Sequence, residues 1–300
     1  MKATTQPRLA DVSPGRLLTA PLRALPDFLV AGAMKGGTSS LFSYLGQHPQ
    51  VLPASTKEVY YFDRQFARGP GWYRAHFPLK YTLWNRSRRR GMSTLTGEAT
   101  PSYLSHPHAP RRAAELVPEA KILISLRNPV DRSYSQYQNM LREEREHLSF
   151  EEALEAEPER TRLRIEAIEQ DPEHNDWHYM HQAYLARGHY EEQVARWLKH
   201  FPKESVLVLR SEDMFENAQG FYAHMLDFLG LQPRTKTDLA PQNTASYDPM
   251  PKHVRKRLIE YYEPHNRALY ELVGRDFGWE RQAAVDHHRA GHRTEARRPL

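Results

Sequence analysis

Residues 27–40 read Asp27-Phe-Leu-Val-Ala-Gly-Ala-Met-Lys-Gly-Gly-Thr-Ser-Ser40 and carry the strongest structural signal in the chain. The apolar run 28–33 is typical of a strand that is buried on both faces. It leads into the glycine pair Gly36 and Gly37 and then into hydroxyl residues that can begin a helix. A helix N-terminus behind such a loop points backbone N–H groups at one place, which favours a bound phosphate. We therefore predict a phosphate-binding loop at the end of a buried strand.

The same order of strand, turn and helix recurs along the chain. Further strands are predicted over 94–97, 121–126 and 206–209, and helices over 38–47, 131–142 and 220–229. This alternation predicts a single α/β domain with a central parallel sheet flanked by helices. Because ligands bind at the carboxyl ends of parallel strands, the chemistry is expected in the loops after Ala33, Gly97 and Leu126.

The composition excludes several classes of protein and site. The chain has 300 residues with 16 Tyr, 11 Phe and 5 Trp, which supply a core and exclude a wholly disordered protein. The absence of Cys excludes disulfides, thiolate metal sites and cysteine nucleophiles, and is compatible with a reducing cytoplasm. The net charge of +5 and the pI of about 9.3 suit an anionic ligand without requiring a nucleic acid, so no nucleic-acid partner is predicted.

The folded domain is predicted over 26–280. Residues 1–25 contain cations but no apolar signal-peptide segment, and are predicted to form a loosely ordered arm. Residues 281–300 are rich in His, Arg and Ala and are predicted to form a solvated tail. No apolar run approaches the roughly 20 residues that span a bilayer. These features predict a cytoplasmic protein without a transmembrane segment.

The glycine loop differs from the loop that binds nucleoside triphosphates. Gly36 and Gly37 allow the backbone to approach a ligand closely, and Lys35 supplies an ammonium group. In the triphosphate motif GxxxxGK[ST] the lysine lies between the last glycine and the hydroxyl residue, whereas Lys35 precedes the glycine pair. Arg127 also follows a later strand at the point where a metal-binding Asp is expected. No metal site is therefore predicted. The hydroxyl residues that complete the loop are Thr38, Ser39 and Ser40.

A second anion-binding segment follows the predicted strand 121–126. Arg127 lies at the carboxyl end of this strand, Pro129 breaks the chain, and Ser133 and Ser135 fall near the start of the next helix. A guanidinium group and a hydroxyl at a helix N-terminus can together bind a phosphate. Two anion receptors at adjacent strand ends, without metal-binding acids, favour a nucleotide that is phosphorylated at two positions.

These segments resemble the sulfotransferases that use 3′-phosphoadenosine 5′-phosphosulfate (PAPS), especially the glycan-modifying, heparan-sulfate-type enzymes and related bacterial proteins. The motifs that carry the resemblance are Lys35-Gly-Gly-Thr-Ser39, Lys57-Glu-Val-Tyr-Tyr-Phe-Asp63, Gly71-Trp-Tyr73, Gly97-Glu-Ala-Thr-Pro-Ser-Tyr103 and Leu126-Arg-Asn-Pro-Val-Asp-Arg-Ser-Tyr-Ser135. The likeness continues through 188–202, 228–230 and 274–279, and so covers nearly all of the predicted domain.

The resemblance implies a P-loop-like phosphosulfate-binding loop and a role for each matching residue. Lys35 would contact the bridging oxygen and the 5′-phosphosulfate, and Glu58 would be the catalytic base. The remaining donor contacts would come from Gly36, Gly37, Thr38 and Ser39 around the phosphosulfate, from Arg127 and Ser135 on the 3′-phosphate, and from a closing loop at 243–252. The resemblance implies PAPS as sulfate donor, no metal, and an acceptor hydroxyl on a glycan, a glycolipid or a small metabolite.

Two positions depart from the heparan-acting members of that family. Tyr60 stands where they usually have His, and Ala99 stands where they often have Lys; both positions face the glycan in the family. Each change removes a positive charge, which favours a neutral or lightly charged acceptor. Tyr60 and Phe62 either line the acceptor cleft or pack against the strand. Glu98 either orients Lys35 or caps a turn.

Other interpretations stay open from the residues alone. One is a P-loop kinase or nucleotidase, and another is a non-catalytic protein that binds a nucleotide or polyanion, in which Glu58 is a surface partner of Lys57. The basic run Arg86–Arg90 forms either a solvated loop or a guide for an anionic acceptor. The charged segment 143–170 is predicted to be a solvated helix rather than a lid, and Trp72 and Tyr73 to pack in the core.

Two groups of histidines have a spacing that resembles metal ligands. His174, His178 and His181 can lie on one helix face, but no carboxylate partner is evident for them. His287, His288 and His292 fall in the predicted tail. Neither group is predicted to bind a metal.

Overall fold

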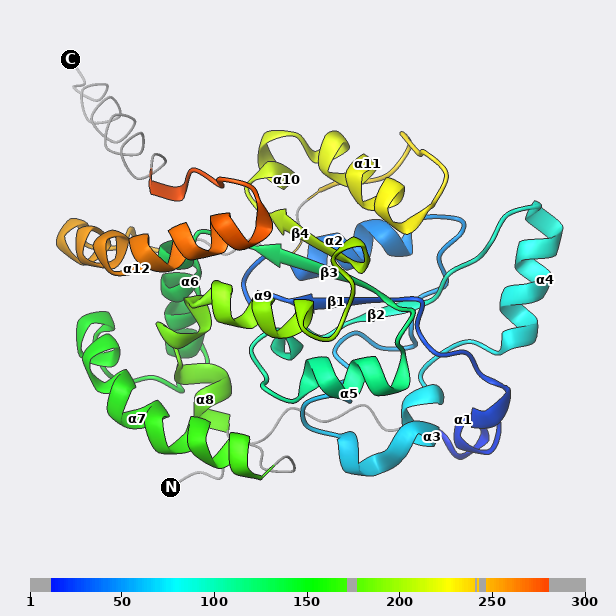
Figure 1. Ribbon diagram of the computed structural model, residues 1–300, viewed down its shortest axis with the longest axis horizontal. Coiled ribbons are helices and arrows are strands. Elements are labelled where there is room, and N and C mark those ends of the chain that lie inside the picture. The colour runs from blue at the N-terminus through cyan, green and yellow to red at the C-terminus, as the bar shows by residue number, and fades with distance from the viewer. Residues whose placement is uncertain (1–11, 172–176, 241, 243–246, 281–300) are drawn as a thin grey trace, which may run out of the picture.

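The computed structural model describes residues 12–171, 177–240, 242 and 247–280. Its centre is a sheet of four parallel strands, namely β1 (Phe28–Gly32), β2 (Gly97–Ala99), β3 (Lys121–Leu126) and β4 (Val206–Arg210). They lie in the order β2-β1-β3-β4 (Figure 1). This confirms the predicted α/β domain with a central parallel sheet flanked by helices.

Helices cover both faces of the sheet, which gives the domain three layers (Figure 1). The main covering helices are α2 (Thr38–Gly46), α5 (Ala109–Leu116), α9 (Tyr190–Leu198) and α11 (Ala218–Leu229). Alternate residues of β1 point to opposite faces. Phe28 and Val30 join the core beneath α2 and α11, whereas Leu29 and Ala31 join the core beneath α5 and α9. Burial on both faces explains why β1 reads as a continuous apolar run.

A helical lobe adjoins the carboxyl end of the sheet (Figure 1). It contains α6 (Pro129–Arg142), α7 (Phe150–Gln170), α8 (Trp177–Gln182) and α12 (Lys252–Val273). Helix α7 begins in a capping box, in which the Ser149 and Glu152 side chains each accept a backbone N–H of the other residue. The predicted solvated helix over 143–170 is wrong in part. It starts only at Phe150, and Phe150, Ala153 and Leu154 pack into the lobe.

Shorter elements complete the domain. They are α1 (Pro14–Leu18), η1 (Ala20–Leu22), η2 (Phe66–Arg68), α3 (Gly69–Arg74), α4 (Lys80–Arg90), η3 (Pro101–Tyr103), η4 (Ala186–Gly188), η5 (Lys203–Ser205) and α10 (Asp213–Glu216).

Strand β2 starts later than the predicted 94–97, and only Gly97–Ala99 pairs with β1. Leu95 is instead paired with the segment that follows α2. Its N–H donates to Gln50 O at 2.7 Å, and the Leu52 N–H donates to Leu95 O at 2.9 Å. A competing backbone partner therefore takes the first residues of the predicted strand.

The predicted arm over 1–25 is not loose over its described part. Residues 12–25 contain α1 and η1, and two arginines from this segment hold the chain that follows α3. Arg16 Nε donates to Ala75 O at 2.6 Å, and Arg23 Nη1 donates to Phe77 O at 2.7 Å. These bonds tie the start of the domain to its body, a long-range contact that the composition of the segment did not reveal.

Several predictions concern residues outside the described part. These are the arm over 1–11, His174, residues 243–246 of the possible closing loop at 243–252, and the tail with His287, His288 and His292. Among the described residues, no helix combines the length and apolar character needed to cross a membrane.

Glu98 is the polar centre of the core beside β2. Its carboxylate accepts hydrogen bonds from Tyr73 Oη at 3.0 Å, Tyr103 Oη at 2.8 Å and Thr100 Oγ1 at 2.6 Å, and its side chain is fully buried. These bonds fasten α3 and η3 to β2. Burial raises the pKa of Glu98 to about 7, even though the three hydroxyl donors act to lower it.

We predict that Glu98→Gln changes how stability depends on pH. A carboxyl group whose pKa rises from 4.5 to about 7 on folding contributes stability below pH 4.5, and that stability is lost as the pH rises through 7. The loss for the wild-type protein amounts to about 3 kcal/mol. Urea unfolding should therefore show that the free energy of unfolding of the wild type exceeds that of Glu98→Gln by more at pH 5 than at pH 8. An equal difference at both pH values would contradict a neutral, buried Glu98.

Candidate functional site

A cleft of about 460 Å³ opens at the carboxyl ends of β1 and β3. Most of its lining comes from four segments that are far apart in the sequence: the loop between β1 and α2 with the first turn of α2, the residues around Glu58, the start of α6, and the segment 211–215. Pro101, Gln242 and Tyr247 complete the lining. The structure therefore brings most of the predicted site into one place. The predicted residues that line the cleft are Lys35, Gly37, Thr38, Ser39, Ser40, Glu58, Arg127 and Ser135.

The loop between β1 and α2 has the geometry of an anion receptor. Gly37 adopts φ 82° directly before α2 and has no side chain to cap the helix. The first N–H groups of a helix have no partner within the helix, so here they face the cleft with the helix dipole behind them. The hydroxyl residues Thr38 and Ser39 stand beside these groups.

Gly36 has a different role from the one predicted. It does not line the cleft; it lies against β3. A Cβ atom on Gly36 would be 2.3 Å from the backbone oxygen of Ser125. Ser125 Oγ donates to Gly36 O at 2.6 Å, and Ala33 N–H donates to Ser125 O at 2.7 Å. The missing side chain therefore permits close contact with the neighbouring strand rather than with a ligand.

Lys35 reaches into the cleft from a left-handed backbone position with φ 67°. Its Nζ donates to Asn139 Oδ1 of α6 at 3.4 Å. Burial lowers the pKa of Lys35, and the nearby cations of Arg142 and Arg127 lower it further. This concentration of positive charge is what a bound anion would relieve. Glu98, predicted as the residue that orients Lys35, bonds to core hydroxyls instead.

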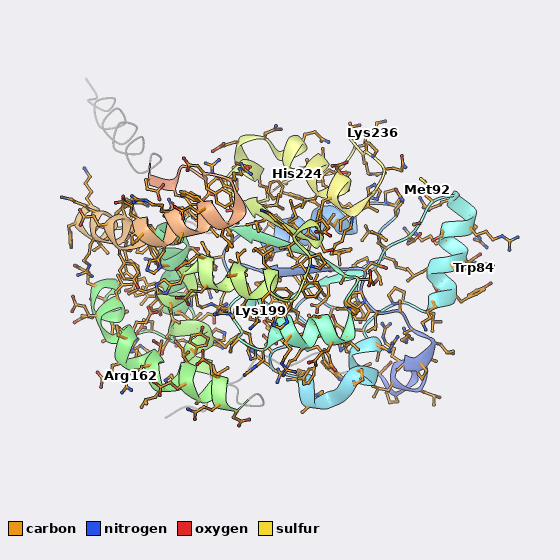
Figure 2. The ribbon with its side chains drawn as sticks, in the orientation of Figure 1. Trp84, Met92, Arg162, Lys199, His224 and Lys236 are labelled. Carbon is orange, nitrogen blue, oxygen red and sulfur yellow. The ribbon has the colours of Figure 1, made fainter. Side chains whose placement is uncertain are left out.

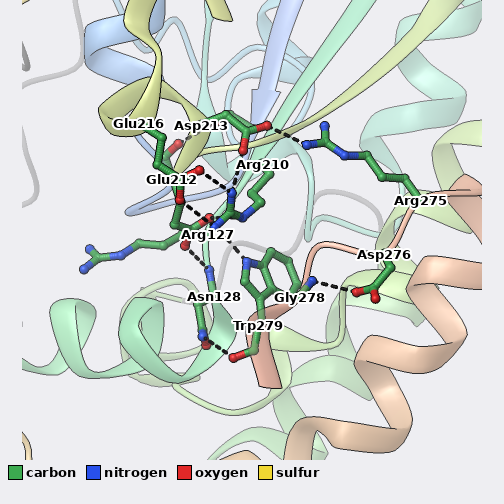
Figure 3. A network of polar contacts seen from close by, with 12 residues as sticks. Arg127, Asn128, Arg210, Glu212, Asp213, Glu216, Arg275, Asp276, Gly278 and Trp279 are labelled. Carbon is green, nitrogen blue, oxygen red and sulfur yellow. Dashed lines mark hydrogen bonds and ion pairs between the residues drawn. The ribbon is translucent and has the colours of Figure 1, made fainter. Parts of the chain in front are cut away.

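Arg127 follows β3 directly and lines the same cleft. Among the described residues no carboxylate pairs with its guanidinium. Figure 3 shows its side chain extending away from a network that fixes the next residue. There Asn128 N–H donates to Glu212 Oε1 at 2.8 Å, Trp279 Nε1 donates to Glu212 Oε2 at 3.3 Å, and Asn128 Oδ1 caps α6 by accepting Val130 N–H.

Sequence reasoning missed this support for Arg127. An Asn one residue before a Pro at the start of a helix is a capping signal that identifies Asn128. Glu212 and Trp279 lie far along the chain and carry no local signal. Only the fold shows that they hold the loop on which Arg127 stands.

Glu58 lies at the edge of the cleft next to two polar partners. Its carboxylate pairs with the Lys57 ammonium and accepts a hydrogen bond from Tyr60 Oη. Burial by itself acts to raise the pKa of Glu58, but Lys57 and the bond from Tyr60 outweigh it and bring the pKa below its usual value. Glu58 is therefore an anion at neutral pH. The Arg64 guanidinium lies over the Tyr60 ring, 4.4 Å from its centre.

Backbone strain gathers around the cleft. In the described chain, four residues other than glycine have positive φ, and three of them are Lys35, Glu58 and Tyr60. Such conformations cost about 1–3 kcal/mol each and persist where the surroundings enforce them. Their position beside one cleft supports a functional role for it.

Several candidate residues lie away from the cleft. Phe62 is fully buried and packs edge-on against Tyr103, so the prediction that it lines the acceptor cleft is wrong. Glu98 is enclosed in the same core. Ala99 is fully buried within β2, and Trp72 and Tyr73 pack in the core as predicted.

The basic run is also remote from the cleft. Arg86–Arg90 belongs to α4, which precedes the amino end of β2, whereas the cleft lies at the carboxyl ends of the strands (Figure 1). The run is helical rather than a loop, and it is not part of the cleft lining.

Comparison with known proteins gives a consistent result. Residues 25–259 match the family described as "Sulfotransferase domain". A sulfotransferase from Alicyclobacillus acidocaldarius has a crystal structure that aligns with a TM-score of 0.66 at 32% identity, covering 86% of this chain and 99% of that one. The chain is 28% identical to the membrane-associated sulfotransferase kil1 of Dictyostelium discoideum, over 93% of this chain and 70% of that protein. It is 29% identical to human heparan sulfate glucosamine 3-O-sulfotransferase 6, over 86% and 74%.

The family match covers most of the domain and includes every segment of the cleft up to Tyr247. The solved relative exceeds 30% identity over most of both chains. This protein therefore belongs to the sulfotransferase family and is an enzyme that transfers a sulfuryl group.

Proposed function

We propose that this sulfotransferase takes its sulfuryl group from PAPS and passes it to a hydroxyl of a glycan, a glycolipid or a small metabolite. One observation carries the proposal: two anion receptors and an ionised carboxylate share a single cleft. The receptors suit a donor with phosphate at both ends of its ribose, and the carboxylate suits removal of a hydroxyl proton.

On the donor side, Lys35 and the N–H groups at the start of α2 would hold the 5′-phosphosulfate. Arg127 and Ser135 would hold the 3′-phosphate from the other side of the cleft. A guanidinium without a carboxylate partner is suited to this task, because binding a phosphate costs it no existing ion pair. The nucleotide phosphate is a good leaving group, so we propose that the reaction needs no metal.

On the acceptor side, Glu58 would take the proton of the attacking hydroxyl. The acceptor oxygen forms a bond to sulfur, and the bond between sulfur and the phosphate oxygen breaks. Lys35 would neutralise the charge that develops on the departing phosphate. Adenosine 3′,5′-bisphosphate then leaves with the electron pair of the broken bond.

The charges that line the cleft support a neutral or lightly charged acceptor. Its described cations are Lys35, Lys57 and Arg127. Two of them are assigned to the donor, and Lys57 already pairs with Glu58. No cation on this lining is left for a sulfate group on the acceptor. Ala99 is fully buried within β2, so the shortage of free cations in the cleft depends on the pairing of Lys57 with Glu58.

The two alternative functions, a P-loop kinase or nucleotidase and a non-catalytic binding protein, have less support. A kinase or nucleotidase needs an acid that holds a metal, and Arg127 occupies the corresponding strand end. A non-catalytic binding protein has no use for a strained, ionised Glu58 at the cleft edge. We also propose a cytoplasmic location, which suits a chain of 300 residues without cysteine.

We predict that Arg127→Ala removes the preference for a 3′-phosphate. The loss of one charge-assisted contact, worth about 1.5–3 kcal/mol, should weaken the binding of adenosine 3′,5′-bisphosphate by about 10- to 150-fold. Adenosine 5′-monophosphate should bind nearly as it does to wild type. Equilibrium binding of both nucleotides measures the ratio. Arg275→Ala removes a charge outside the cleft lining and should leave the ratio unchanged; equal weakening of both nucleotides by Arg127→Ala would contradict the assignment.

We predict that Tyr60→Phe shifts the pH dependence of activity. Glu58 must be ionised to accept a proton, so kcat/KM falls as the pH drops through its pKa. Without the hydroxyl bond the pKa of Glu58 rises, and the acidic limb should move to higher pH. Tyr134→Phe removes a hydroxyl bonded to Asp248 O outside the cleft and should leave the limb in place. An unmoved limb in a folded Tyr60→Phe protein would exclude Glu58 as the titrating base.

We predict faster sulfation of neutral glycosides than of a heparan oligosaccharide. The test incubates each acceptor with PAPS and measures the sulfate-sized gain in intact mass over time. Glu58→Gln should abolish the gain on every acceptor while leaving nucleotide binding intact. A strong preference for the heparan chain would overturn the acceptor assignment, and full activity of Glu58→Gln would overturn the base.

A further inference from the structure

Helix α4 is a basic helix on the surface, with no buried residue. It carries Lys80, Arg86 and Arg88–Arg90, and its eleven residues include no acid. Tyr81 and Trp84 are 68% and 53% exposed, and their rings lie 5.8 Å apart. Figure 2 shows Trp84 projecting from α4 away from the body of the protein. Aromatic rings and cations thus share one exposed surface.

Exposed leucines extend this surface. Leu18 of α1 is 85% exposed and Leu22 of η1 is 64% exposed. An isolated antiparallel bridge between Arg23 and Leu79 joins the end of η1 to the start of α4, which places Leu22 beside Lys80. Figure 1 shows α1 and α4 at the same end of the molecule. We call this surface, formed by α1, η1 and α4, the α1–α4 face.

The cations of α4 have no acidic partner among the residues that the structure describes. Within the described chain no carboxylate pairs with any of the five. Arg86 donates to Pro49 O, and the Arg88 guanidinium lies over the Trp84 ring. Two exposed arginines elsewhere do have such partners: Arg111 pairs with Glu115, and Arg267 with Glu263. The α1–α4 face is therefore an uncompensated patch of positive charge.

We infer that the α1–α4 face docks the protein on a membrane surface that contains anionic lipids. Unpaired cations attract anionic headgroups, and exposed aromatic and leucine side chains can enter the boundary between headgroups and acyl chains. A nucleic acid or a sulfated polymer would bind the cations but would offer little apolar contact to Leu18 and Leu22. The face lies at the amino end of the sheet, so docking leaves the cleft at the carboxyl end open.

The test is co-sedimentation of the full-length protein with vesicles of phosphatidylcholine alone or with phosphatidylserine added. Wild type should bind the vesicles that contain phosphatidylserine and not the neutral ones. The variant Arg88→Gln/Arg89→Gln/Arg90→Gln should bind on the order of 100-fold more weakly. The variant Leu18→Ser/Trp84→Ser should bind about tenfold more weakly, because it loses apolar contact and no charge. Thermal melts and sulfation of a dissolved acceptor confirm that each variant is folded.

A matched control removes three charges elsewhere. Arg162, Lys256 and Arg267 are exposed on α7 and α12, and Figure 2 shows Arg162 at the opposite end of the molecule from Trp84. Their combined change to Gln should leave vesicle binding near the wild-type value. If this control lost as much vesicle binding as the Arg88→Gln/Arg89→Gln/Arg90→Gln variant, net charge alone would account for the attraction and the proposal would be overturned. Absence of binding to anionic vesicles would also overturn the proposal. It would be overturned as well if Leu18→Ser/Trp84→Ser bound the vesicles as tightly as wild type and a DNA duplex displaced the protein from them.

Discussion

The site depends on the contact between the loop after β1 and the end of β3. Ser125 accepts the Ala33 N–H through its backbone oxygen and donates through its hydroxyl to Gly36 O. Any side chain on residue 36 would collide with the β3 backbone. Because the two strand ends are locked together in this way, Lys35 and Arg127 open into one cleft. The two segments proposed to bind the phosphates of the donor therefore face the same cleft.

Charge then divides the cleft into two parts. Lys35 and Arg127 sit close enough to act on each other, and the pKa of Lys35 falls as a result of burial and of its cationic neighbours. Glu58 has the opposite situation, since Lys57 and Tyr60 stabilise its anion. The donor part therefore gains from a bound anion, whereas the acceptor part already contains one. The α1–α4 face also carries cations without acidic partners among the described residues, but it lies at the other end of the sheet. There we propose that a membrane surface, rather than a small molecule, supplies the negative charge.

Much of this arrangement could be predicted from the sequence, because local patterns report it. The apolar runs predicted β1, β3 and β4 to within a residue or two. The glycine loop and the segment after Leu126, singled out from the sequence, both line the cleft. The errors concern contacts between distant segments. Leu95 is taken by the chain after α2, and Phe62 turns into the core. Glu98 accepts hydrogen bonds from three hydroxyl groups, and no local sequence pattern predicts this. The support of Asn128 by Glu212 and Trp279 depends on the tertiary fold in the same way.

We propose that the cleft binds a nucleotide through two separate phosphate-binding segments and without a metal. Titration calorimetry of the wild-type protein in the presence of a chelator tests it most directly. We expect clear binding of adenosine 3′,5′-bisphosphate in the presence of the chelator, and weak binding of ATP whether or not Mg²⁺ is present. Tighter binding of ATP that requires Mg²⁺ would contradict it.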